Sequence, residues 1–357
     1  MRICIYTKRL TQRLDEGIAR VAHELASGLA KHHEVLTLFS LGDVVETENL
    51  VRITSNRIGL DLRLRARIRS FRPDVILYIV RGPATPAALL FGKILGSYWQ
   101  AAAVAILAPQ TRSLRSGWAR KCAAFLNPGL ILTTSTTDRT EFSRVGCPAE
   151  FVPLGVNVDA FTPATQDVKR ALRHKYGLPE GQFVVLHVGH IQQGRNIGAL
   201  GCLQKSDTQV LVAASTFSQA NASLARQLQA QGVRFLNQYF DRVQEMYQLA
   251  DVYVFPTVSE EACIGQPLSV LEAMACNLPV VSTKFGGLPD LFPVDGDGLY
   301  YADSPSDIAA KTVYVREHLS SIQPRTRELV KPYSWERTCR EVSRLLSNQV
   351  ARRTPAA

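Results

Sequence analysis

The sequence lacks long apolar runs and paired cysteines. No apolar stretch in its 357 residues reaches the ~18–20 residues that a membrane-spanning helix needs, and the opening MRICIYTKRL has no apolar signal core. The seven cysteines are odd in number and include no C-x-x-C pair, which argues against a disulfide framework and against a zinc site. These absences predict a cytoplasmic protein with no membrane span and no zinc site, whose cysteines are small buried hydrophobes.

The overall composition is typical of a soluble globular protein, with 46% hydrophobic and 20% charged residues. The chain is too long for one ordinary core, so two domains of roughly 150–200 residues each are expected. The net charge of +10 is uneven: residues 1–155 carry 21 Lys and Arg against 12 Asp and Glu, and residues 156–357 carry 20 against 19. The basic half is expected to meet an anionic partner. Nucleic acid is not expected, because no recognised binding module accompanies the charge.

Strand and helix patterns alternate along the chain. Residues 58–72 fit both patterns, and Pro73 with the buried strand after it favours a helix there. Repeated βα units in both halves predict an α/β fold with two parallel sheets, each covered by helices on both faces. Apolar runs predict strands at 2–7, 34–41, 74–80, 101–108, 130–135, 183–190, 208–215, 233–239, 252–257, 279–283 and 298–302, and amphipathic spacing predicts helices at 18–33, 86–95, 114–126, 138–146 and 168–177.

Residues 249–290 carry the most specific chemistry. They read as a buried strand (VYVFPT), a polar loop, a helix that opens at a proline and carries Glu272, and a second buried strand (PVVST). Parallel α/β sheets build ligand sites where a strand passes through a loop into a helix N-terminus. A carboxylate beside unbonded helix amides can hold sugar hydroxyls and phosphate oxygens in one site.

Several segments, in order, resemble the family-4 retaining glycosyltransferases: GIARVAHELASGLAK, FVPLGVNVDAFTP, LHVGHIQQGRNI, PLSVLEAMACNLPVVSTKFGG and YSWERTCREV. The resemblance implies the GT-B fold, in which two Rossmann-like domains face each other across a cleft. It also implies a UDP-, GDP- or ADP-sugar donor and transfer to an acceptor hydroxyl with retention, without a metal or another cofactor. Synthesis of cell-surface polysaccharide, lipopolysaccharide or glycolipid would be the setting.

The same resemblance suggests the domain limits. We expect an acceptor-binding domain over 1–155 and a nucleotide-sugar-binding domain over 156–335, joined near FVPLGVNVDAFTP. A C-terminal helix at 336–350 is expected to pack back on the first domain, and the tail 351–357 is expected to be disordered.

Glu272 is the leading candidate in the donor site. The resemblance places it on the ribose hydroxyls, and an ionised carboxylate can accept two vicinal hydroxyl protons; the alternative is a glutamate that only complements the helix dipole. Pro267 is expected at the first helical position, which would leave the amides of Leu268 and Ser269 for a phosphate or sugar oxygen. Ser269 could instead only cap the helix.

A second group of donor residues lies in LHVGHIQQGRNI. Gly189 follows a strand and permits close approach of the backbone to a ligand. His190 and Arg195 stand where the family has a basic residue and a lysine. Arg195 could stabilise the leaving diphosphate with its forked guanidinium. The alternatives are an ordinary loop histidine and a surface arginine.

The chain departs from the family in two places. Ile264 occupies the position of a family glutamate that contacts the donor sugar; Glu261, just upstream, is a possible replacement or an ordinary exposed loop residue. Gln110 stands near a family histidine that faces the reacting sugar, on the acceptor side, and an amide cannot act as a base. Gly17 could let the first loop approach the donor phosphates, or could only begin a helix.

Basic helices account for much of the first half's charge. With their tryptophan they could contact an anionic membrane or a phosphate-bearing lipid acceptor, which would place the protein at the inner face of the membrane; the alternative is a solvated helix face. The residues are Arg63, Arg65, Arg67, Arg69, Arg72, Arg112, Arg115, Trp118, Arg120 and Lys121.

The sequence therefore predicts an enzyme that transfers a sugar to a glycan or lipid-linked, anionic acceptor. Two alternatives stay open. One is a catalytically silent binding or scaffold protein on the same fold, which the departures at Ile264, Gln110 and His190 favour. The other is a different enzyme, a nucleotide-sugar epimerase or a phosphorylase; no lysine suits a pyridoxal phosphate cofactor.

Overall fold

A computed structural model gives the fold, and it divides the chain into two compact units. The first unit comprises residues 1–154, 264–266 and 335–357, and the second comprises 155–263 and 267–334. The short stretch 264–266 therefore belongs to the first unit, although both of its flanks belong to the second. The structure describes residues 1–14, 16–53, 61–110, 114, 116–127, 129–214 and 221–353.

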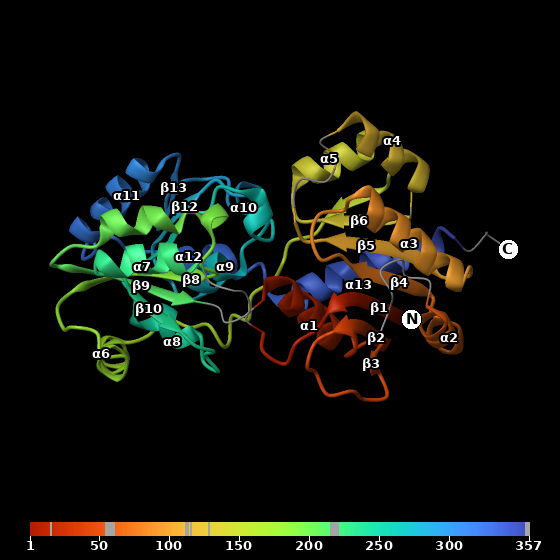
Figure 1. Cartoon of the computed structure of the whole chain (residues 1–357), viewed down its shortest axis with the longest axis horizontal. Coiled ribbons are helices and arrows are strands. Elements are labelled where there is room, and N and C mark those ends of the chain that lie inside the picture. Colours follow the sequence, from red (N-terminus) through yellow and green to blue (C-terminus); the bar gives the residue numbers. More distant parts are fainter. Residues whose placement is uncertain are drawn as a thin grey trace. The chain divides into compact units, whose positions relative to one another are not determined.

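The first unit is built on a seven-stranded parallel sheet with the order β3-β2-β1-β4-β5-β6-β7 (Figure 1). One face packs on α2, α3, α4 and α5, and α1 packs with α13 on the other. The bounds are β1 Arg2–Arg9, α1 Gly17–Leu29, β2 Glu34–Leu41, β3 Leu50–Arg52, α2 Leu62–Phe71, β4 Val75–Ile79, α3 Pro86–Tyr98, β5 Ala103–Ala108, α4 Gly117–Leu126, β6 Leu130–Thr133, α5 Thr136–Arg144, β7 Ala149–Phe151 and α13 Trp335–Ala351.

The second unit has a six-stranded parallel sheet with the order β10-β9-β8-β11-β12-β13 (Figure 1). The helix α9 contacts both α8 and α12, and α7, α11 and η2 form a separate group against the sheet. The bounds are α6 Gln166–Lys175, β8 Phe183–Gly189, η1 Gln193–Arg195, η2 Ile197–Leu203, β9 Thr208–Ala214, α7 Ala222–Ala230, β10 Arg234–Asn237, α8 Gln244–Leu249, β11 Val252–Phe255, η3 Glu260–Ala262, α9 Leu268–Ala275, β12 Val280–Thr283, α10 Leu288–Leu291, β13 Leu299–Ala302, α11 Pro305–Glu317 and α12 Thr326–Val330.

These two parallel sheets confirm the predicted fold class. Central strands such as β5 and β11 are buried along their whole length, as expected for a parallel sheet covered on both faces, and such strands read as continuous apolar runs. The short edge strands β3 and β7 were not predicted, because three residues each are too few to give a pattern.

The ambiguous basic segment forms a helix, as predicted. Asp61 caps α2 by accepting hydrogen bonds from the amides of Arg63 and Leu64. The side chains of Leu64, Ile68 and Phe71 are buried against the sheet. The arginines of this helix are exposed, as are Arg72, Trp118, Arg120 and Lys121. Arg112 and Arg115 lie outside the described residues.

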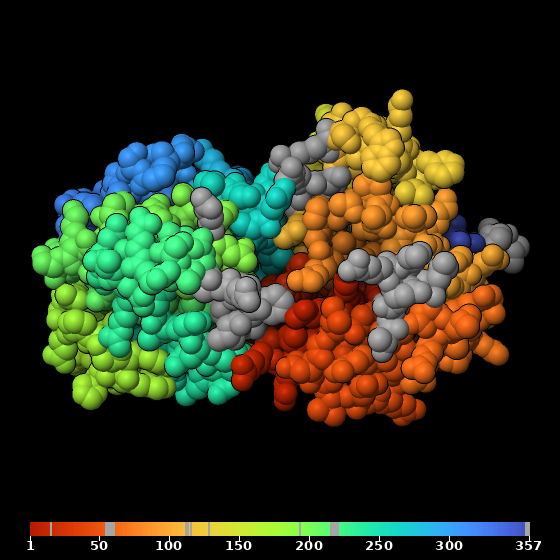
Figure 2. Space-filling view, viewed as in Figure 1, coloured from red at the N-terminus to blue at the C-terminus, as the bar shows by residue number. Residues whose placement is uncertain are grey.

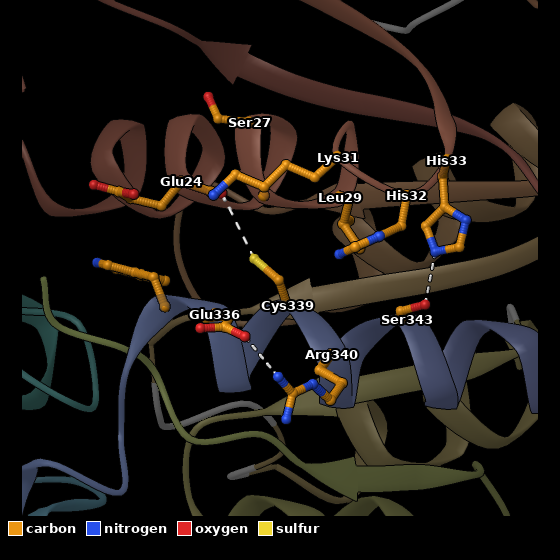
Figure 3. Close-up of a pocket in the computed structure, with 12 residues that line it drawn as sticks. Glu24, Ser27, Leu29, Lys31, His32, His33, Glu336, Cys339, Arg340 and Ser343 are labelled. Atoms are coloured by element: carbon orange, nitrogen blue, oxygen red, sulfur yellow. Dashed lines mark hydrogen bonds and ion pairs between the residues drawn. The ribbon is translucent and has the colours of Figure 1, made fainter.

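The C-terminal helix α13 packs against α1 inside the first unit, and a groove of about 330 Å³ runs between them (Figure 3). Gly28 allows this close approach, because a Cβ there would lie 2.3 Å from Sγ of Cys339. His33 Nε2 and Ser343 Oγ are hydrogen-bonded at 2.7 Å across the helices. Of the tail that was predicted to be disordered, Ala351 ends α13 and residues 354–357 lie outside the described part of the chain.

Membrane-spanning helices are absent from the described residues, since none of their helices combines the length and the apolar character that crossing a bilayer requires.

Candidate functional site

The second unit gathers most of the predicted donor residues at the carboxyl ends of two adjacent strands. β8 ends at Gly189, β11 ends at Phe255, and the two strands pair in parallel. The loops that leave these ends carry η1 and η3, which contact each other, and η3 is followed by α9. Ligands of parallel α/β sheets bind beyond such strand ends.

Arg195 lies buried in this region, with only 7% of its surface exposed. Its Nε donates a 3.2 Å hydrogen bond to the carbonyl of Ala262 in η3. Among the described residues it forms no ion pair with an acid. A buried guanidinium without a carboxylate partner carries an unbalanced positive charge, which an anionic ligand would neutralise.

Gly189 makes room for that guanidinium. Its φ of +153° lies in the region that favours glycine. A Cβ at this position would lie 2.4 Å from NH1 of Arg195, closer than real contacts allow. The sequence predicted a glycine that admits a ligand; in the structure it also admits the arginine side chain.

Glu272 is half-buried on α9, and its Oε2 accepts a 2.7 Å hydrogen bond from the hydroxyl of Tyr247. Burial first, and then the charge of Glu272, raises the pKa of Tyr247 well above its ordinary value. The phenol therefore stays protonated and keeps donating to the carboxylate. The sequence did not single out Tyr247, because no local pattern distinguishes it from an ordinary core tyrosine between Met246 and Leu249.

The start of α9 differs from the prediction by one residue. Pro267 takes the N-cap position with an extended backbone (φ −61°, ψ 115°), and the helix begins at Leu268. Its carbonyl accepts from the amides of Val270 and Leu271. Within the described part of the chain, the amides of Leu268 and Ser269 have no backbone acceptor, as expected for the first amides of a helix.

The side chain of Ser269 does not cap its own helix. Its Oγ lies 2.7 Å from the hydroxyl of Tyr253, a fully buried residue of β11. Tyr253 in turn packs against Tyr247, with ring centroids 5.8 Å apart. The buried Tyr253 thus holds Ser269, and the buried Tyr247 holds Glu272. Neither tyrosine was predicted to belong to the site.

His187 is a further residue of this region that was not predicted from the sequence. It is fully buried in β8, where its Nδ1 donates a 2.9 Å hydrogen bond to the carbonyl of Val254. Burial lowers its pKa to about 4; the hydrogen bond to Val254 opposes that shift, and the charges of Arg195 and His190 add to it. A histidine inside an apolar run (FVVLHVG) is the signal that could have identified it.

The remaining second-unit candidates lie closer to solvent. His190 and Glu260 are half-buried, and Glu261 is exposed in η3. All three take part in interactions within the protein. The roles toward a donor that the sequence predicts for His190 and Glu261 stay predictions.

The first-unit candidates form a separate group. Gly17 is the first residue of α1, and a Cβ there would lie 3.2 Å from the side chain of Ile264. Ile264 is buried at 5% exposure, so the position of the family glutamate is here an apolar contact. Gln110 is half-buried, and its Oε1 lies 3.3 Å from where a Cβ of Gly82 would stand.

Gln266 holds this returning segment in the first unit. It is fully buried; its Oε1 accepts from the amide of Leu154 at 2.6 Å and its Nε2 donates to the carbonyl of Thr134 at 2.9 Å. The neighbouring amide of Gly265 donates to the carbonyl of Pro109 at 2.6 Å. These bonds explain why Ile264 is buried rather than exposed. Gln266 was not predicted, since its partners are more than 100 residues away in the chain.

Two other features bear on the site. The groove between α1 and α13 in the first unit contains none of the predicted donor residues; its lining mixes Glu24, Lys31, His32, Glu336 and Arg340 (Figure 3). No group of three or more histidine, cysteine or acidic side chains suited to a metal ion occurs among the described residues.

The family model and the curated relatives that this chain resembles are all glycosyltransferases. Residues 183–318 match the family model described as Glycosyl transferases group 1. The sulfoquinovosyl transferase SQD2 of Arabidopsis thaliana is 28% identical over 51% of this chain and 36% of its own length. A D-inositol 3-phosphate glycosyltransferase of Mycolicibacterium smegmatis is 33% identical over 39% of this chain and 33% of its own length. The chain thus matches only about a third of the length of these curated relatives.

Solved structures match nearly the whole chain. A sucrose-phosphate synthase from Thermosynechococcus elongatus aligns with a TM-score of 0.79 at 16% identity, covering 99% of this chain and 100% of that one. The Anabaena protein Alr3699/HepE, solved in complex with UDP, aligns with a TM-score of 0.75 at 15% identity, over 98% of this chain and 100% of that one. At such identities the likeness establishes the fold, which is that of the GT-B glycosyltransferases.

Proposed function

We propose that this chain, whose residues 183–318 belong to the glycosyl transferases group 1 family, transfers a sugar from a nucleoside-diphosphate sugar to an acceptor hydroxyl. The observation that carries the proposal is Arg195: a buried guanidinium with no ion pair among the described residues, beside Gly189 at a strand end. A diphosphate is the ligand that such a group fits, because its oxygens match the guanidinium fork.

The surrounding groups complete a donor site in the second unit. The first amides of α9, at Leu268 and Ser269, carry the partial positive charge of a helix N-terminus. Glu272, anchored by Tyr247, offers a carboxylate to the ribose hydroxyls. The UDP complexes of the Anabaena protein, which has this fold, support a nucleotide ligand.

Catalysis would depend mainly on charge. As the bond between the sugar and the diphosphate breaks, negative charge grows on the leaving oxygen, and Arg195 would stabilise it more strongly than it stabilises the bound donor. His190 would add to this when protonated. The resemblance to retaining transferases supports retention of configuration and a reaction that needs no metal.

Calorimetry with UDP, GDP and ADP tests this site. We expect one of the three to bind, and the pair of substitutions Glu272→Ala and Arg195→Ala to abolish that binding. The matched control is Glu180→Ala with Arg234→Ala: Glu180 is exposed, and Arg234 bonds only to the carbonyls of Tyr176 and Gly177 in the described structure. Binding that survives the first pair of substitutions unchanged would refute the site.

The acceptor is proposed to be a glycan or lipid-linked molecule held by the first unit near a membrane. Helix α4 exposes Trp118 at 69% and Phe125 at 81% of their surfaces, and Figure 2 shows its yellow side chains at the surface of that unit. Lys93 of α3 lies over the ring of Phe125 at 5.4 Å. Aromatic and basic side chains together suit the interface of an anionic membrane, which supports a location at its inner face.

A catalytically silent binding protein is the second candidate, and the burial of Ile264 favours it. An apolar contact stands where related transferases have a donor-binding glutamate. Hydrolysis of a nucleotide sugar above background, lost in Arg195→Ala, would rule the silent protein out. Incubation with UDP-GlcNAc and no acceptor would detect an epimerase instead.

A further inference from the structure

His187 and Arg195 both approach Gly189, and the buried ring of His187 is held in place by its neighbours. The imidazole ring of His187 packs against two aromatic side chains. It is stacked on Tyr253 with ring centroids 6.3 Å apart, and it is tilted relative to Phe255 with ring centroids 6.4 Å apart. Its Nδ1 is fixed by the carbonyl of Val254 at 2.9 Å. The orientation of the imidazole is therefore determined on three sides, and its second nitrogen can point in only one direction.

That second nitrogen is a buried acceptor. A carbonyl only accepts hydrogen bonds, so Nδ1 carries the proton and the neutral ring has a lone pair on Nε2. Nε2 is buried and has no hydrogen-bond partner in the described part of the chain. Leaving a buried polar atom unpaired is costly, and proteins seldom do so without a function.

Gly189 lies close to both His187 and Arg195. A Cβ built on this glycine would lie 3.5 Å from Nε2 of His187 and 2.4 Å from NH1 of Arg195. Both nitrogens therefore lie within 3.5 Å of one point, on the same side of a backbone that has no side chain to separate them. NH1 of Arg195 is a hydrogen-bond donor of a buried cation, and Nε2 of His187 is an acceptor without a partner in the described part of the chain.

We propose that His187 is the positioning residue of Arg195: its Nε2 accepts from one bound water, that water accepts a guanidinium N–H, and this aims the remaining N–H groups at the anionic ligand. The inference rests on the proposed donor site, because it assigns Arg195 to a diphosphate. A neutral acceptor is required, since a protonated ring would have no lone pair and would repel the guanidinium. The buried aromatic surroundings keep the ring neutral.

A double-mutant cycle tests this role with UDP as the probe, or with whichever of GDP and ADP binds instead. His187→Phe keeps the ring and its stacking on Tyr253 but removes both nitrogens. We expect it to weaken nucleotide affinity about tenfold in the wild-type background and less than twofold in Arg195→Ala, because it acts only through the arginine. His187→Gln, which keeps an acceptor and a donor, should stay within about threefold of wild type.

The outcomes separate this inference from the proposed function. If Arg195→Ala leaves nucleotide binding unchanged, the donor site itself is wrong. If Arg195→Ala weakens binding, but His187→Phe has no effect or the same effect in both backgrounds, only the positioning role is wrong, since a purely structural role would be additive.

A measurement without nucleotide covers the case in which His187→Phe does not fold. In full-length protein with 15N-labelled histidine, the Nε2 resonance of His187 should move toward that of an unbonded imidazole nitrogen when Arg195 is replaced by alanine. An unchanged resonance would overturn the contact, whatever the nucleotide experiments give.

Discussion

The hydroxyl of Tyr247 donates a 2.7 Å hydrogen bond to Oε2 of Glu272, so a fully buried phenol anchors a half-buried carboxylate from another helix. The bond can serve either of two purposes. It can orient the carboxylate for a ligand, or it can simply satisfy the tyrosine, which would otherwise be a buried hydroxyl without a partner.

Substitutions at the two positions distinguish these purposes. If the carboxylate binds ribose, Glu272→Gln should lower nucleotide affinity about 10- to 100-fold, because hydrogen bonds to a charged acceptor are the stronger ones. Tyr247→Phe should lower it only about two- to fivefold, since the carboxylate remains but is less well oriented. Calorimetry measures both. Equal losses of stability with unchanged affinity would mean that the pair is structural.

Gly189→Ala should damage the site through the position of Arg195. The added methyl group would lie 2.4 Å from NH1, and φ is +153°, so both the guanidinium and the backbone must shift. We expect nucleotide affinity to fall at least tenfold and the free energy of unfolding to fall by about 1–2 kcal/mol.

Gly181→Ala is the matched control for that variant. Gly181 also has a positive φ, +79°, but a Cβ there meets nothing within 4 Å. It should lose a similar amount of stability, about 1–2 kcal/mol, and keep full nucleotide affinity. If both glycine variants weaken binding alike, backbone strain rather than the displaced arginine is responsible.

The sheets and most helices could be predicted from sequence because each is encoded locally. A buried parallel strand such as β11 is an apolar run, and α2 combines an apolar stripe with a capping aspartate. The glycine at 189 and the arginine at 195 could be found for the same reason, since both lie within one short segment after a strand.

Contacts between distant segments could not be predicted. Tyr247, Tyr253 and His187 read as core residues, and their polar atoms acquire meaning only through partners 16 to 67 residues away. The burial of Ile264 depends on Gln266 bonding to residues 112 and 132 positions earlier. A local pattern contains none of this information.

The folded protein should lose stability in mild acid because of His187. Its folded-state pKa is about 4, below the roughly 6.5 of an unfolded histidine, so between these values the unfolded chain binds the extra proton. The free energy of unfolding should therefore fall as the pH drops from 6.5 to 4, by up to about 3 kcal/mol from this residue.

Urea unfolding at pH 7 and pH 4.5 measures that loss. His187→Phe should have the smaller difference between the two conditions, although it is less stable at pH 7 because the carbonyl of Val254 loses its partner. His174→Phe, at an exposed position of α6, should retain the wild-type difference. An identical difference in all three proteins would contradict a buried neutral imidazole.

Membrane contact should depend on the exposed aromatic residues of α4. Replacing both Trp118 and Phe125 by serine should lower co-sedimentation with anionic vesicles at low salt by at least tenfold, because each side chain could bury a large apolar surface at the interface. Val45→Ser with Val294→Ser is the control, since these valines are 74% and 72% exposed elsewhere. Failure of the unaltered protein to sediment at all would make α4 an ordinary surface.

The contact between Gly28 and Cys339 should set how closely α13 packs on α1. Gly28→Ala would place a methyl group 2.3 Å from Sγ and 3.2 Å from Cβ of Cys339. We expect a loss of about 1–3 kcal/mol in the free energy of unfolding, as is usual when a packed interface receives extra volume. Urea or thermal unfolding of the full chain gives the value.

A second substitution should reverse part of that loss. Cys339→Ala removes the sulfur, and the remaining Cβ distance of 3.2 Å still requires a small adjustment, so the double variant should recover most but not all of the stability. Gly117→Ala, at the start of α4 with nothing within 4 Å of its added Cβ, should be neutral or slightly stabilising. If the two changes at Gly28 and Cys339 prove additive instead, the helices adjust independently of this contact, and the glycine is not what allows α13 to lie so close to α1.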